Sequence, residues 1–219
     1  FKNQTPEVAF KNQTPEVAFK NQTSEDSFDE EGETQIINGE AIPQGRFPFM
    51  VAVVANDYLY CGGSIISKGF VLTAAHCVKH GNDRTWAAHQ LRVGVGSVYH
   101  PDLTWHPVEW VKPDKNFRLS NLGNGNDVAI LKLKHPLTLQ KGRVETIALA
   151  PPGSPVPGKL SLIGWGHTRN FNAKPVQLLR GVDVNIISLR ECTRISHVRF
   201  TNNNIFCDKG NNKGFCNVS

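Results

Sequence analysis

The stretch Leu72-Thr73-Ala74-Ala75-His76-Cys77 decides the fold, because an apolar run ends there on a histidine that a cysteine follows directly. A hydrolase needs a base held beside its nucleophile, and a histidine can act as that base near neutral pH. A cysteine next to such a histidine can pin it through a disulfide. A second cysteine stands sixteen residues upstream, in Cys61-Gly62-Gly63-Ser64 at the end of another apolar run. A lone histidine is more often structural, but this setting favours a catalytic one.

A carboxylate leads into a second apolar run, Asn126-Asp127-Val128-Ala129-Ile130-Leu131-Lys132-Leu133. Beside an imidazole, Asp127 would fix the ring tautomer and stabilise the imidazolium. Taken alone, Asp127 is more typical of an ordinary turn, since Gly123-Asn124-Gly125 comes just before it.

Short apolar runs continue along the chain from residue 36, separated by glycine, proline, asparagine and aspartate. The 219 residues include 19 glycines and 13 prolines, and 39% of them are hydrophobic. This pattern predicts an all-β barrel or sandwich with a substantial core and no long helix. The predicted strands are residues 50–55, 59–66, 70–74, 91–98, 128–133 and 160–164.

Residues 1–35 differ from the rest. The sequence FKNQTPEVA occurs at 1–9 and at 10–18, and a third copy beginning at Phe19 decays into the acidic run of residues 24–35. Few large apolar residues are present, so we predict a disordered, propeptide-like leader before a domain spanning residues 36–219.

The charge divides at the same boundary. The leader carries three lysines and eight acidic residues, and the whole chain is +5, so residues 36–219 carry +10. A basic body could bind acidic substrates, glycosaminoglycan or a cell surface, but we favour a solvated surface with a tethered acidic tail. We expect no nucleic-acid partner.

The five cysteines form no C-x-x-C pair, and the eight histidines are scattered, so we expect no metal site and no cofactor. No apolar run is long enough to span a membrane. Sequons at Asn3, Asn12, Asn21 and Asn217 agree with a secreted, extracellular glycoprotein.

Residues 36–217 resemble the trypsin/chymotrypsin family of serine endopeptidases, particularly chymotrypsin-like members of arthropods. The motifs that carry the resemblance follow one another in family order: Ile36-Ile37-Asn38-Gly39, Phe47-Pro48, Cys61-Gly62-Gly63-Ser64, Ala74-Ala75-His76-Cys77, the Asp127 run, Gly164-Trp165-Gly166, and residues 179–192 followed by Cys207 and Cys216.

The resemblance implies two six-stranded β-barrels with the active site between them. It makes His76 the general base and Asp127 its orienting partner, and it pairs Cys61 with Cys77 and Cys192 with Cys207. Ile36 would be the N-terminus released when an activating protease cuts the Gln35–Ile36 bond of a zymogen. We expect a monomer that acts on a protein or peptide substrate.

Three positions depart from the family pattern. Gln35 replaces the usual Arg or Lys, so a trypsin-like activator is not expected to cut there. Asn38 replaces a usual glycine, which is mild because asparagine tolerates positive φ. Leu160 stands where many relatives have another cysteine, so that bridge is expected to be absent.

The fourth departure concerns the nucleophile. In the family, one variable residue and then Gly-Asp-Ser-Gly-Gly follow the cysteine matched by Cys216, whereas here the sequence reads Asn217-Val218-Ser219. Ser219 is one position too early and lacks the preceding glycine and aspartate. We therefore expect this chain to be truncated, with a complete first barrel, an incomplete second barrel, no nucleophilic serine and no activity of its own.

The family's pocket-floor position falls on Gly214, which offers no charge for an Arg or Lys substrate. A chymotrypsin-like or elastase-like specificity is therefore predicted, and Phe215 would narrow the pocket. The alternative function is a non-catalytic homologue that binds partners or regulates a cascade. Intact His76 and Asp127 weigh against that alternative. A third hypothesis, that the repeat leader is an adhesive or glycosylated tail, is weaker than a disposable propeptide.

Overall fold

The computed structural model describes residues 36–37, 39–56, 59–120, 125–155, 158–165, 177–196, 207–208 and 214–215. The predicted leader, residues 1–35, lies outside the described residues. So do all four sequons, Asn38, and the positions Gln35, Cys216 and Ser219.

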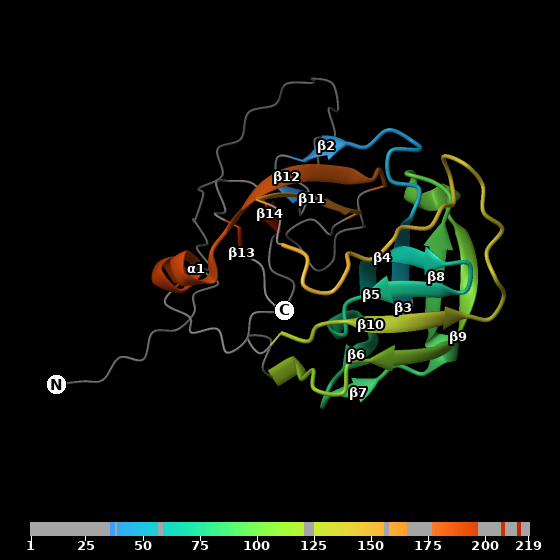
Figure 1. Cartoon of the computed structure of the whole chain (residues 1–219). Coiled ribbons are helices and arrows are strands. Elements are labelled where there is room, and N and C mark those ends of the chain that lie inside the picture. Colours follow the sequence, from blue (N-terminus) through green and yellow to red (C-terminus); the bar gives the residue numbers. More distant parts are fainter. Residues whose placement is uncertain are drawn as a thin grey trace, which may run out of the picture.

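Six antiparallel strands close into a barrel (Figure 1). Around the barrel the order is β10-β5-β4-β3-β8-β9, so the strands formed by the first motif and by the Asp127 run are neighbours. The strands are β3 (Met50–Ala55), β4 (Leu59–Ser67), β5 (Phe70–Thr73), β8 (Leu91–Val95), β9 (Thr104–Pro113) and β10 (Ala129–Leu133).

Alternation along the strands fills the barrel interior. In β10, Ala129, Leu131 and Leu133 are buried and the two residues between them are not, as expected for a strand with one face on a core. Strand β3 is buried on both faces, because Val51 and Val53 point into the barrel core while Ala52 belongs to a second apolar cluster. This strand therefore connects two cores.

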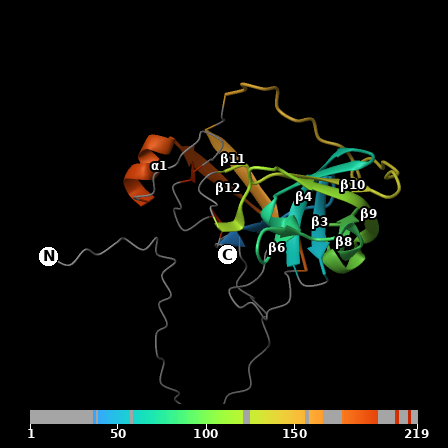
Figure 2. The same ribbon diagram turned by 90° about the horizontal axis from the view of Figure 1, so that it is seen from below.

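A second, open sheet lies beside the barrel (Figures 1 and 2). Its central strand is β12 (Arg180–Ile187), which pairs with β11 (Lys159–Gly164), β13 (Cys207–Asp208) and β2 (Glu40–Ala41). Val182 and Val184 form its small apolar cluster, with Leu160 packed against them. Leu160, at the position where the resemblance implies a cysteine in many family members, thus packs as an apolar side chain.

A short helix, α1 (Leu189–Ser196), follows β12 directly. The Glu191 backbone N–H donates to Ser188 Oγ at 3.1 Å, which satisfies one of the free donors at the helix start. A disulfide between Cys192 and Cys207 ties the helix to β13, as the family resemblance implied.

The second apolar cluster joins the barrel to the open sheet. Its buried members are Ile42, Ala52, Leu103, Trp165 and Leu179, which come from both parts of the molecule. Hydrogen bonds reinforce the joint. The Val98 carbonyl accepts from the Leu179 backbone N–H at 2.8 Å and from Trp165 Nε1 at 2.9 Å.

The remaining elements are short. Strand β1 (Ile36–Ile37) pairs with β14 (Gly214–Phe215), and β6 (Lys79–His80) pairs with β7 (Arg84–Thr85). Three 3-10 turns are η1 (His76–Val78), η2 (Ala88–Gln90) and η3 (His100–Asp102). Within the described ranges, no helix has the length and apolar character needed to cross a membrane.

The prediction of an all-β fold built on a closed six-stranded barrel is confirmed. Each of the six predicted runs forms a strand, with ends that differ from the expected ones by three residues at most. Strands β9 and β12 were not predicted.

Candidate catalytic site

Two neighbouring barrel strands bring His76 and Asp127 together. Strands β5 and β10 are antiparallel, and Thr73 at the end of β5 lies opposite Ala129 at the start of β10. The chain leaving β5 therefore runs beside the chain entering β10. His76 begins the turn after β5, and Asp127 stands two residues before β10.

A left-handed turn delivers Asp127 to this position. Gly125 has φ 64° and Asn126 has φ 60°, values that glycine adopts freely and that asparagine tolerates better than most residues. The Val128 backbone N–H closes the turn by donating to the Asn126 carbonyl at 2.8 Å. The glycine and asparagine before Asp127 are thus part of the site's construction.

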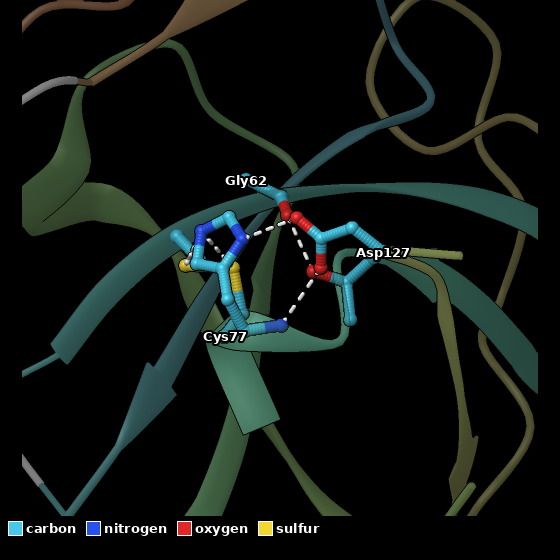
Figure 3. Close-up of a disulfide and its surroundings, with 6 residues drawn as sticks. Gly62, Cys77 and Asp127 are labelled. Atoms are coloured by element: carbon cyan, nitrogen blue, oxygen red, sulfur yellow. Dashed lines mark hydrogen bonds and ion pairs between the residues drawn. A yellow bond between two sulfur atoms is a disulfide. The ribbon is translucent and has the colours of Figure 1, made fainter. Parts of the chain in front are cut away.

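Asp127 holds His76 at two points (Figure 3). Its Oδ1 accepts from the His76 backbone N–H at 2.9 Å, and its Oδ2 lies 2.7 Å from ring atom Nδ1. About a third of each side chain is exposed, 36% for His76 and 33% for Asp127. The pair is therefore held by two hydrogen bonds and is still exposed to solvent.

Opposing effects set the pKa of Asp127. Desolvation by burial, the largest effect, raises the pKa. It is outweighed by the hydrogen bonds from the side chain and backbone of His76, the charge of His76 and a hydrogen bond from the Ala75 backbone, so the pKa lies below its ordinary value. Asp127 is ionised at neutral pH and accepts hydrogen bonds only.

This assignment fixes the tautomer of His76. Because an ionised carboxylate cannot donate, Nδ1 must carry the proton that bridges to Oδ2. In the neutral ring, Nε2 then has a free lone pair. The arrangement is that of a general base oriented by a carboxylate.

The Cys61–Cys77 disulfide lies against the same imidazole, and Figure 3 draws Cys77 and Asp127 around it. Nε2 is 3.4 Å from Cys77 Sγ and 4.0 Å from Cys61 Sγ. The bridge joins β4 to η1, and Thr73 Oγ1 donates to the Gly62 carbonyl at 2.8 Å beside it. The backbone on both sides of His76 is therefore fixed to the barrel.

Two other predicted site residues lie on paired strands, one position apart in register. Strand β1 contains Ile36 and strand β14 contains Gly214, and their register places Ile37 opposite Gly214. The predicted activation segment and the predicted pocket floor thus form one small sheet. Both predicted disulfides, Cys61–Cys77 and Cys192–Cys207, are present.

Sequence reasoning did not anticipate what surrounds Nε2. In the part of the chain that the structure describes, this nitrogen contacts the two sulfur atoms at hydrogen-bonding range, and no serine or threonine hydroxyl bonds to it. The adjacency of His76 and Cys77 places a sulfur near the histidine backbone, but it does not set which way the ring points. The base and its orienting carboxylate are in place, and the described residues present no nucleophile to them.

Comparison with known proteins shows which proteins this chain resembles. The family model described as Trypsin matches residues 36–217. A vitellin-degrading protease of Bombyx mori is 32% identical over 68% of this chain and 54% of its own length. Brachyurin of Leptuca pugilator is 31% identical over 83% of this chain and 77% of its own length. The chain thus spans about half to three quarters of these relatives.

A solved structure has the same fold. The inactivated protease paralogue S-D1 of the scabies mite superposes with a TM-score of 0.68 at 22% identity, over 81% of this chain and 76% of that one.

Proposed function

Because the chain belongs to the trypsin family of serine proteases, we propose that it serves a secreted, glycosylated serine endopeptidase as the part that carries the general base and its orienting carboxylate. The observation that carries the proposal is the contact between His76 and Asp127, with the ring nitrogen 2.7 Å from a carboxylate oxygen. Residues 36–219 form the protease domain, and residues 1–35 form a removable leader.

The proton path follows from the tautomer. Nε2 of His76 takes the proton of an attacking hydroxyl, and the resulting imidazolium is stabilised by Asp127, whose pKa stays below its ordinary value. The same proton then passes to the leaving amine. The Gly-Asp-Ser-Gly-Gly motif, which supplies the attacking hydroxyl and the oxyanion hole in the family, does not occur in residues 1–219, so the proposal assigns no nucleophile to these residues.

Gly214 sets the substrate preference in this proposal. A glycine at the pocket floor provides no carboxylate for an Arg or Lys side chain, which favours an apolar or aromatic residue before the cut bond. Phe215, adjacent in β14, narrows the same pocket. The substrate is a protein or peptide, and the enzyme is a monomer.

Activation would depend on the bond between Gln35 and Ile36. The pairing of Ile37 with Gly214 supports a link between this cleavage and formation of the substrate pocket. A cut before Ile36 frees the end of β1, and β1 is paired with the strand that contains the proposed pocket floor. Because Gln35 is not basic, the activating protease accepts glutamine or a neighbouring feature of the acidic leader.

The test is a chimera in which Asn217 is followed by the C-terminal part of a family member carrying Gly-Asp-Ser-Gly-Gly. Gln35→Arg allows immobilised trypsin to open the junction. We expect the opened chimera to cleave chromogenic Phe, Tyr or Leu peptides and residues 1–219 to be inert. His76→Ala lowers kcat by about 10⁴ or more, and Asp127→Asn by about 10⁴.

His89→Ala is the matched control, because His89 is an exposed histidine on η2. We expect its kcat to stay within about twofold of the parent chimera, as for surface changes in general. Undiminished activity in His76→Ala would show that His76 is not the general base. Arg substrates cleaved far faster than Phe, Tyr or Leu substrates would overturn the specificity.

The second candidate is a non-catalytic homologue that binds or regulates a protein partner. It is supported by one observation: among the described residues, no serine or threonine hydroxyl bonds to Nε2 of His76. Sequencing the transcript past the Asn217 codon separates the two. A downstream Gly-Asp-Ser-Gly-Gly supports the enzyme, and another residue at the serine position supports the binding protein.

A further inference from the structure

Three atoms that can bind a metal meet on the side of His76 away from Asp127. They are Nε2 of His76 and the sulfurs of Cys61 and Cys77, and all three lie within 4.8 Å of one another. Cys61 comes from β4, while His76 and Cys77 come from η1. Paired strands therefore hold the set together independently of the disulfide, since β4 pairs with β5, which leads into η1.

The disulfide keeps the two sulfurs from acting as thiolate ligands, so the oxidised protein cannot bind a cation through them. Reduction changes that. A dithiol, or a phosphine in the test tube, supplies two electrons and is itself oxidised, and the disulfide becomes two thiols. Each thiol then loses one proton when it binds a cation.

The distances around Nε2 fit a tetrahedral zinc site. With bonds of about 2.3 Å to sulfur and about 2.0 Å to nitrogen, tetrahedral geometry places sulfur and nitrogen about 3.5 Å apart. The two distances here are 3.4 Å and 4.0 Å. Once the covalent bond is broken, the two sulfurs only have to separate, and Nε2 can remain where it is.

The second ring nitrogen is already arranged as in a metal-binding histidine. Metal-binding histidines commonly donate their other N–H to a carboxylate, which fixes the ring and makes the ligating nitrogen more basic. Asp127 accepts that hydrogen bond here at 2.7 Å. Thiolates and imidazole together select zinc and other thiophilic divalent cations over magnesium or calcium.

We propose that reduction of the Cys61–Cys77 disulfide converts this cluster into a Cys₂His site for a thiophilic divalent cation, with zinc as the natural occupant. The fourth position is open to water. Since the cation takes the lone pair of Nε2, the loaded protein cannot use His76 as a base. That consequence rests on the proposed function, whereas the binding itself does not.

The experiment uses the full chain, reduced with a phosphine and titrated with Cd²⁺ while the ultraviolet thiolate-to-cadmium band is followed. Cys192, Cys207 and Cys216 also become thiols, so the reference is Cys61→Ser/Cys77→Ser, which keeps them. We expect the unsubstituted chain to bind one more Cd²⁺ than this reference. Zn²⁺ competition against a chromophoric chelator then ranks the affinities.

Two histidine substitutions test the nitrogen ligand. His76→Gln keeps both cysteines and forms the disulfide before reduction, so it reports on the ligand without preventing folding. We expect it to weaken Zn²⁺ binding at least tenfold, His89→Gln to leave it unchanged, and Asp127→Asn to weaken it by about 10- to 100-fold.

Two results would overturn the proposal. One is equal Cd²⁺ stoichiometry in the unsubstituted chain and in Cys61→Ser/Cys77→Ser. The other is equal Zn²⁺ affinity in His76→Gln and His89→Gln. Neither measurement involves substrate, so an inert chimera would count against the protease function while leaving the metal site standing.

Discussion

Asp127 uses each of its two oxygens for a different purpose. Oδ1 fixes the backbone of His76, and Oδ2 fixes the ring. A substitution at this position therefore changes local stability as well as chemistry, and the two effects can be separated by measuring stability without substrate.

We predict that Asp127→Asn lowers the free energy of unfolding by about 1 kcal/mol at pH 5, a small effect because a third of the side chain is exposed to solvent. The pKa of Asp127 is lowered in the fold. Its contribution is therefore complete above the unfolded-chain pKa of about 3.9 and is lost as the pH falls through the lower folded value. Urea unfolding from pH 5 to pH 2 checks this.

The difference between the unsubstituted chain and the variant should shrink steadily across that range. Asp102→Asn, at an exposed aspartate on η3, is the control and should show no comparable trend. A difference for Asp127→Asn that stays constant down to pH 2 would contradict the account.

At this scale the family resemblance implied both disulfides, which are present, and the motifs around His76 and Asp127 predicted that these two side chains would meet. The sequence did not indicate that Nε2 faces the sulfurs. That contact depends on the orientation of the His76 ring, which Asp127 imposes from fifty-one positions away. Local sequence contains no information about that orientation.

At the scale of elements, the glycines of β4 allow close approach inside the barrel. A Cβ on Gly63 would lie 2.8 Å from the Leu72 carbonyl oxygen, 3.0 Å from a Val51 methyl and 3.1 Å from a Val71 methyl. The first of these neighbours is backbone and cannot move without shifting β5. Strand β5 leads directly into His76, so the glycine protects the geometry of the site.

We predict that Gly63→Ala lowers the free energy of unfolding by about 1–3 kcal/mol, since it overpacks a tightly packed region. Gly69→Ala is the matched control. A Cβ at Gly69 meets nothing within 4 Å, so its effect should stay within about 0.5 kcal/mol. Chemical denaturation of both variants measures the difference, and equal stabilities would show that β4 and β5 adjust freely.

The strands that the sequence predicted are those whose apolar side chains dominate, such as β3 and β10. Strand β9 was missed for a physical reason. It contains Pro107 and ends on Pro113, and of its ten residues only Val108 is buried. Proline normally argues against a strand, but the Pro107 carbonyl still accepts from the Lys134 backbone N–H at 3.0 Å.

At the scale of the whole molecule, the barrel and the open sheet are joined by the second apolar cluster and by hydrogen bonds to the Val98 carbonyl. We call this contact region the joint. Trp165 is 6% exposed and bonds through Nε1 to the Val98 carbonyl at 2.9 Å. His100 packs edge-on against both Trp105 and Trp165. Burial also lowers the pKa of His100, so this ring is neutral in the joint at neutral pH.

We predict that Trp165→Phe lowers the free energy of unfolding by about 1–2 kcal/mol, because it removes a buried hydrogen bond and part of a buried ring. Trp110→Phe is the control, since Trp110 is 38% exposed on the outside of the barrel. Its effect should be within about 0.5 kcal/mol. Thermal unfolding followed by calorimetry compares them, and a Trp165→Phe variant as stable as Trp110→Phe would mean that the joint contributes little.

The fold class could be predicted from the sequence, but this joint could not. Its buried residues are Ile42, Ala52 in β3, Leu103 just after η3, Trp165 just after β11 and Leu179 just before β12. Only the three-dimensional arrangement brings these segments together, so no local pattern marks Trp165 or Leu103 as members of one cluster.

The pairing of β2 with β12 also has a consequence for the order in which the molecule forms during synthesis. Glu40 and Ala41 are made before the barrel, yet their partners Gly181 and Arg180 are made long after it. At about 5–20 residues per second, a ribosome needs roughly 7 to 30 s to reach those partners. All six barrel strands lie between residues 50 and 133, so the barrel can close during that delay. Strands β1 and β2 therefore stay unpaired until β14 and β12 have been synthesised, by which time the barrel can already have closed.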